Sequence, residues 1–154
     1  MVKFSEILNE LIDDKGLSLR KLARESGVTS SQLSKYLKGL MPTIEIAVRL
    51  ANYFEVTLDF LFGVESENFF VEPIELDLDN FVNKYEKLLA EAKTSHYKIA
   101  KKTTLSESSL RRWRKGHVPS MDAFVIIADA LSTSIDFLVG KVSDKISKCK
   151  FATI

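Results

Sequence analysis

Apolar residues recur along the first part of this chain at helical spacing. Within FSEILNELIDD, positions 4, 7, 8, 11 and 12 are apolar and fall on one face of a helix. The segments LRKLARES, SSQLSKYL, IEIAVRLANYF and LDFLF follow, with apolar residues mostly three or four positions apart. No segment combines strand-like alternation with a hairpin turn. The pattern predicts five short helices and an all-α fold.

Polar residues suited to helix starts stand before the last four of these segments. Each is a serine or threonine, whose side-chain oxygen can accept a hydrogen bond from an unpaired backbone N–H. They are Ser18, Thr29, Thr43 and Thr57. Gln32 follows Thr29 by three positions, which completes a capping-box pattern. These residues support the predicted starts of the helices.

The whole pattern occurs twice. Residues 4–63 align with residues 81–140 without a gap, and 16 of the 60 aligned pairs are identical. In both copies a Lys-Gly pair is followed by proline three residues after the glycine. A repeat of this length is a complete domain rather than one unit of a solenoid. The predicted organisation is a first domain at 1–63, a linker at 64–80, a second domain at 81–140 and a basic C-terminal tail at 141–154.

A tight turn is predicted between the second and third helices of each domain. Ala23 lets the two helices approach, Gly27 provides the turn, and an apolar pair closes the seam. The apolar pair is Val28 and Leu33, and the second copy has Ala100, Leu105 and Leu110 at the matching positions. Thr104 replaces the turn glycine there, and we expect strain because threonine tolerates a positive φ poorly.

Both repeats resemble the lambda-repressor-like helix-turn-helix family, also called the Cro or XRE type. The first repeat carries LRKLARESGVTSSQLSKYLKG, a proline and then VTLDFLFG. The second carries YKIAKKTTLSESSLRRWRKG, a proline and then STSIDFLVG. The resemblance implies two tandem five-helix domains, each of which places its third helix in the major groove of double-stranded DNA.

The resemblance also marks candidate DNA contacts. In the first domain they are Ser30, Ser31, Ser34, Lys35 and Lys38. In the second they are Glu107, Ser108, Arg111, Arg112 and Lys115. Members of the family often hold a phosphate with a glutamine where this chain has Leu19 and His96. Leu19 cannot form that hydrogen bond, whereas His96 is expected to donate one to a phosphate.

Charge divides unevenly along the chain despite a net charge of +1. Residues 1–79 contain 8 Lys or Arg against 14 acidic residues, and residues 80–154 contain 14 against 7. This asymmetry indicates a nucleic-acid or other acidic partner for the second half. The basic residues of the second domain form either a DNA-binding cluster, which we favour, or a solvated helix face. They are Lys101, Lys102, Arg111, Arg112, Arg114 and Lys115. Because phosphate neutralisation supplies much of the affinity for DNA, the second domain is expected to bind more tightly.

The aromatic residues at helical spacing are assigned to core packing rather than to DNA binding. We expect Tyr36 and Trp113 to lie in the cores rather than to stack on bases, because each is at helical spacing from a leucine. The apolar residues at 60–62 and 137–139 belong to the core or to a self-association surface. Linker 64–80 has six acidic residues and no basic one, yet it is too apolar for a free tether, so we expect it to pack on the domains. Asp77 or Asp79 is expected to cap the next helix.

The remaining chemistry excludes several classes of function. One cysteine, Cys149, and two histidines cannot form a disulfide, a cysteine-rich zinc site or a nucleophile constellation, so we expect no cofactor, no metal and no enzymatic activity. No apolar run approaches the roughly 18 residues of a membrane helix. We interpret the N-terminus as that of a cytoplasmic protein, and positions 141–154 leave no room for a small-molecule ligand domain.

The sequence therefore predicts a transcriptional regulator, interpreted as a repressor, that binds specific double-stranded DNA. A homodimer that reads a palindrome is favoured over a single chain that reads two unlike half-sites. The alternative function is a protein-interaction adaptor or antitoxin in which the first domain no longer binds DNA.

Overall fold

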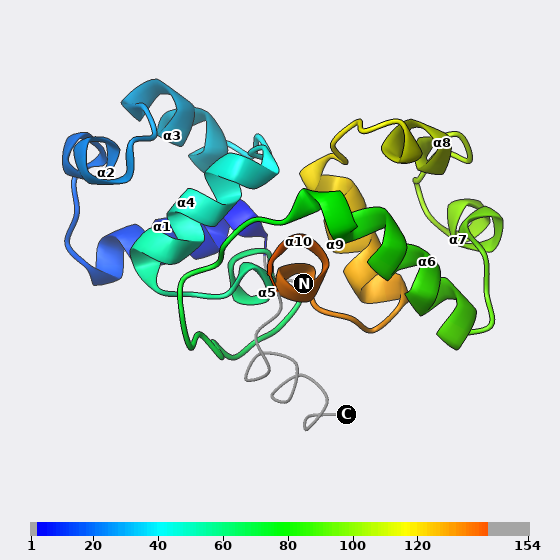
Figure 1. Cartoon of the computed structure of the whole chain (residues 1–154). Coiled ribbons are helices and arrows are strands. Elements are labelled where there is room, and N and C mark those ends of the chain that lie inside the picture. The colour runs from blue at the N-terminus through cyan, green and yellow to red at the C-terminus, as the bar shows by residue number, and fades with distance from the viewer. Residues whose placement is uncertain (1–2, 142–154) are drawn as a thin grey trace. The chain divides into compact units, whose positions relative to one another are not determined.

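The structure, a computed structural model, describes residues 3–141 (Figure 1). Over this range the regular elements are α-helices and one 3-10 turn, with a single isolated β-bridge and no strand. The all-α prediction is confirmed for these residues. They divide into two compact units with the boundary between Ile74 and Glu75.

The first unit contains five helices that begin where the sequence predicts. They are α1 (Phe4–Asp14), α2 (Leu19–Ser26), α3 (Ser30–Leu37), α4 (Ile44–Phe54) and α5 (Leu58–Leu61). All four predicted caps form, with the side chain accepting from the third residue of its helix. The capping box is complete, because Gln32 Oε1 also accepts from the Thr29 backbone N–H at 3.2 Å.

The core of the first unit is built from the apolar faces of these helices. Leu8, Leu33 and Leu50 are fully buried. The rings of Phe4 and Phe62 stack with centroids 4.7 Å apart, and Tyr36 lies 6.2 Å from Phe4. The predicted core position of Tyr36 is therefore confirmed.

The second unit repeats this order. It contains the 3-10 turn η1 (Leu78–Asn80), α6 (Phe81–Glu91), α7 (His96–Lys102), α8 (Ser109–Arg114), α9 (Met121–Ala130) and α10 (Ile135–Val139). Its core holds a denser aromatic cluster, in which Phe81 contacts Tyr85, Trp113 and Phe124 with centroids 5.1–5.9 Å apart. Trp113 is buried, as predicted.

Residues 64–80 pack on the units, as expected for so apolar a segment. Asn68 donates to the Glu55 carbonyl at 2.9 Å and accepts from the Thr57 N–H at 3.1 Å, which holds the loop after α5 against the first unit. Asn52 on α4 exchanges two hydrogen bonds with the backbone of Ile74, at 2.7 and 3.0 Å. These bonds fix the loop at both of its ends.

The remainder of that segment belongs to the second unit. The Asp77 N–H donates to the Val139 carbonyl at 2.7 Å, and Leu76 forms an isolated bridge with Gly140. The predicted cap by Asp77 or Asp79 is wrong, because α6 has no side-chain cap and the Asp77 carboxylate instead accepts from Asn80 at 2.7 Å. The 3-10 turn leads directly into α6, so no aspartate takes the cap position.

Most of the predicted basic tail, with Cys149, lies outside the described residues. None of the helices within 3–141 is long and apolar enough to cross a membrane. In the same range no three His, Cys, Asp or Glu side chains gather where they could hold a metal ion.

Candidate nucleic-acid interface

Helices α2 and α3 of the first unit form a tight helix-turn-helix (Figure 1). Gly27 ends α2 with φ at 79°, in the left-handed region that the turn requires. The Ser26 hydroxyl donates to the Leu22 carbonyl at 2.7 Å and accepts from the Val28 N–H at 3.2 Å. Val28 and Leu33 are buried in the seam, so the predicted closure of this turn is confirmed.

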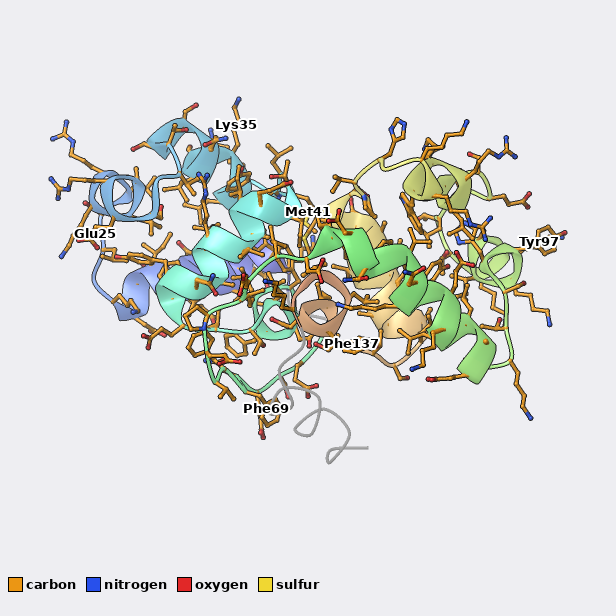
Figure 2. The ribbon with its side chains drawn as sticks, viewed as in Figure 1. Glu25, Lys35, Met41, Phe69, Tyr97 and Phe137 are labelled. Atoms are coloured by element: carbon orange, nitrogen blue, oxygen red, sulfur yellow. The ribbon has the colours of Figure 1, made fainter. Side chains whose placement is uncertain are left out.

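The structure brings the five predicted contacts of the first unit together on α3 and its C-terminal end. Their spacing places them on one side of the helix. Ser34 is half-buried and the other four, Ser30, Ser31, Lys35 and Lys38, are exposed. Figure 2 shows Lys35 pointing away from α3. Gly39, with φ at 113°, turns the chain away after Lys38.

This surface is basic although the first unit is acidic as a whole. Positions 18–40 contain five Lys or Arg residues and one acidic residue, Glu25, whose carboxylate accepts from the Tyr53 hydroxyl. Sequence reasoning missed the three basic residues of α2, Arg20, Lys21 and Arg24, all of which are exposed. Counting charge by helix rather than by half of the chain would have found them.

The matching turn of the second unit is built differently. Helix α7 ends at Lys102, and Thr103 continues in an extended conformation with φ at −134° and ψ at −175°. The residues described with a positive φ do not include Thr104, so the predicted strain at Thr104 is wrong. The early exit from the helix removes the need for a left-handed residue.

Helix α8 is shorter than its counterpart. It begins at Ser109, two residues later than the alignment with α3 predicts, so Glu107 and Ser108 precede the helix rather than form its first turn. The Ser106 hydroxyl, which occupies the place of the capping Thr29, bonds instead to Ser108. Ser108 makes no capping bond of its own. The predicted recognition segment from Glu107 to Lys115 is therefore helical only over Ser109–Arg114.

His96 is buried, and the prediction that it donates to a phosphate is wrong. Its Nδ1 lies 2.7 Å from the Tyr85 hydroxyl, and its Nε2 lies 3.0 Å from the Ser106 carbonyl and 3.1 Å from the Ser109 hydroxyl. Because a carbonyl only accepts, Nε2 carries the proton and Nδ1 accepts from Tyr85. Burial raises the pKa of Tyr85 to about 12, which keeps that phenol protonated. Both ring nitrogens are thus engaged inside the unit.

The basic residues of the second unit divide between two environments. Arg111, Arg112 and Lys115 are exposed, and Arg112 also donates to the Ser108 hydroxyl at 2.9 Å. Arg114 is instead paired with Glu86 of α6 at 3.3 Å, which reduces its contribution to the predicted cluster. Positions 95–117 contain seven Lys or Arg residues and one acidic residue.

Helix α7 presents an exposed aromatic residue that the sequence did not single out. Tyr97 is 53% exposed and projects outward from α7 (Figure 2), and Lys101 Nζ lies 4.8 Å from its ring centroid. This cation–π contact places a phenol hydroxyl and an ammonium group on one face of α7. Both are groups that can donate to a phosphate.

Comparison with known families matches residues 8–61 to the helix-turn-helix family HTH_3. A protein of Haloarcula marismortui that carries the name of an HTH-type transcriptional regulatory protein is 39% identical over 54 residues. The match covers 35% of this chain and 17% of the relative, so the chain spans less than a fifth of that relative's length. No solved structure matches the chain. The part of the first unit that includes α2 and α3 is therefore similar to this helix-turn-helix family.

Proposed function

We propose that this protein binds specific double-stranded DNA as a transcriptional regulator, with α3 and α8 each entering a major groove. The observation that carries the proposal is the exposed polar and basic face of α3, in a helix-turn-helix domain whose positions 18–40 are locally basic. The name of the relative from Haloarcula marismortui points to the same role. Occupation of a promoter by such a protein blocks access, so we propose repression.

In the first unit, α3 supplies the contacts that distinguish bases. Ser30 and Ser31 lie in its first turn, where the unpaired backbone N–H groups also favour phosphate. Ser34 and Lys35 follow one turn later, and lysine can donate to the O6 and N7 atoms of guanine. Lys38, just beyond the helix, neutralises a phosphate in the proposed complex.

In the second unit, the positive charge of α8 compensates in DNA binding for the shortness of that helix. Helix α8 has six residues, and its exposed arginines, Arg111 and Arg112, can each bond two acceptors on a guanine or a phosphate. Ser108 holds the Arg112 guanidinium from the preceding turn, and Lys115 adds a further cation. Glu107, exposed beside them, can accept from the amino group of cytosine. We propose that this unit contributes mainly phosphate contacts.

The distribution of charge favours DNA binding over the adaptor alternative. In that alternative the first domain no longer binds DNA, but only one acidic residue of the first unit lies between positions 18 and 40. An acidic unit whose α2 and α3 remain basic is suited to approach phosphates with that surface.

The test is selection of preferred sites from a random duplex pool, followed by binding at several salt concentrations. Replacing Lys38 by alanine should lower the slope of log affinity against log salt by about 0.9, as for one lost phosphate contact. The double variant Arg111→Ala/Arg112→Ala should lower it by up to about twice that amount. Lys87→Ala, an exposed change on α6, is the matched control. Unchanged affinity and slope in both variants would exclude these surfaces.

The same selected site tests the assembly that we favour, a homodimer. A palindromic footprint with a dimeric mass by light scattering supports it. A monomer that protects two unlike half-sites about 34 Å apart would support the single-chain arrangement instead.

A further inference from the structure

The acidic residues of the first unit, apart from Glu25, lie on elements other than α2 and α3. Helix α1 contains four acidic residues and no basic one. Positions 50–74, which include α5 and the loop after it, contain five acidic residues and no Lys, Arg or His. Such a surface repels phosphates, so it has no place in the DNA contact.

A cavity of about 450 Å³ opens between α1 and the chain around α5. Ile7, Leu11 and Phe60 provide its apolar lining. Two carboxylates of α1, those of Glu10 and Asp14, lie at its wall one helical turn apart. The volume is within the range of about 300–1,000 Å³ typical of binding sites, and it suits an apolar side chain whose neighbour is cationic.

The loop that continues from this cavity exposes further apolar residues. Phe69 is 42% exposed and Val71 is 48% exposed, and Figure 2 shows Phe69 directed away from the loop. Asn68 holds the loop through its bonds to the backbone of residues 55 and 57, so these side chains stay outside an otherwise well-packed core. Exposed Glu67 and Glu72 flank them. Neighbouring exposed apolar residues of this kind mark interaction surfaces.

We propose that this acidic–apolar face, made of the cavity and the loop at 65–72, docks a short segment of a partner protein. The segment would place an apolar side chain in the cavity, with Lys or Arg residues beside Glu10 and Asp14. Two features favour a protein segment over a small molecule and over a second copy. The exposed Phe69 and Val71 extend beyond what a ligand of 450 Å³ would cover. A symmetric contact between two copies through this face would oppose like charges.

The experiment uses the full chain, ¹⁵N-labelled for NMR, and three synthetic 12-residue peptides. The first alternates arginine with leucine or phenylalanine, the second has serine in place of the apolar residues, and the third has glutamate in place of arginine. Only the first should bind saturably and shift the amide signals of Leu11 and Gly63. If the second peptide bound as tightly as the first, charge alone would explain the binding. If the third bound as tightly as the first, hydrophobicity alone would explain it. Either result overturns the proposal.

Variants locate the site. Glu10→Gln/Asp14→Asn should weaken the first peptide about tenfold, as expected for the loss of two exposed ion pairs. Glu45→Gln, an exposed change on α4, should leave peptide binding unchanged. Phe69→Ser should weaken it without altering the fold, because that ring is exposed. Equal binding by the double variant and the native chain would overturn the proposal.

The proposed DNA binding is independent of this result. The DNA affinity of Glu10→Gln/Asp14→Asn should equal or slightly exceed that of the native chain. The change removes two negative charges, and α1 carries none of the assigned DNA contacts. Loss of peptide binding with intact DNA binding therefore identifies the acidic–apolar face alone.

Discussion

In the two helix-turn-helix segments, the first helix ends with the same pair of side-chain hydrogen bonds. The second helix begins with a different set of hydrogen bonds in each segment. Ser26 and Thr103, which align in the repeat, each donate a hydroxyl to the carbonyl four residues back and accept from the N–H two residues on. A serine or threonine at this position thus links the end of the helix to the turn by two hydrogen bonds, whether or not a glycine follows. The turn glycine is therefore one solution among two.

The difference lies at the start of the next helix. In the first unit Thr29 and Gln32 satisfy each other's backbone N–H groups, and α3 runs for eight residues. In the second, Ser109 replaces the glutamine, donates to the Ser106 carbonyl at 2.6 Å and accepts from His96. These bonds hold the chain in a non-helical turn, and α8 loses its first two residues. The second unit thus has a buried network in place of an exposed cap, with His96 and Ser109 where the first unit has Leu19 and Gln32.

The largest expected effect comes from breaking that network. His96→Ala leaves the buried Tyr85 hydroxyl without its acceptor and creates a cavity beside Trp113, so the second unit should lose about 2–4 kcal/mol. The only tryptophan of the chain reports this unit directly, through its fluorescence in urea titrations. Leu19→Ala, at the aligned position of the first unit, should leave the tryptophan transition unchanged. An unshifted midpoint in His96→Ala would show that the network is dispensable.

The next largest effect is expected at alkaline pH, which should destabilise the second unit through Tyr85. The pKa of Tyr85 is raised from 10.0 to about 12 by burial, so the folded unit favours the neutral phenol. This contribution, on the order of 2 kcal/mol, is fully present below pH 10 and is lost as pH rises from 10 to 12. Tryptophan-detected stability should fall over that interval in the native chain and fall less in Tyr85→Phe. Parallel losses in both would assign the alkaline sensitivity to other groups.

The glycines after α3 and α8 should respond alike to substitution. Gly39 and Gly116 have φ values of 113° and 97°, and a Cβ added at either would meet no atom within 4 Å. Valine at each position should therefore cost about 1–3 kcal/mol from backbone strain alone. Each variant should lower the stability of its own unit by a similar amount, measured by hydrogen exchange of α4 or α9. An effect in only one unit would show that the two helix ends are not equivalent.

Local residues predicted most of this fold, and long-range contacts account for the errors around α8. The start of α3 follows from Thr29 and Gln32, which are three residues apart, and its structure is as predicted. The burial of His96 depends on its contacts with Tyr85 of α6 and with the turn at Ser106. Neither residue lies in the same helix as His96, so the sequence pattern does not reveal these contacts. The same contacts delay α8, so the errors on Glu107, Ser108 and His96 have one cause.

The smallest predicted effect tests the two helix starts against each other. Thr29→Ala removes the acceptor for the Gln32 N–H and should cost the first unit about 1 kcal/mol. Ser106→Ala removes only exposed bonds to Ser108, so the second unit should lose a few tenths of a kcal/mol. Hydrogen exchange should show faster exchange at the first turn of α3 in Thr29→Ala and little change at α8 in Ser106→Ala. Because α3 presents its first turn to DNA in the proposed complex, Thr29→Ala should also weaken binding to the selected site. Equal losses in the two variants would mean that Ser106 acts as a helix cap after all, and that the two segments differ in length alone.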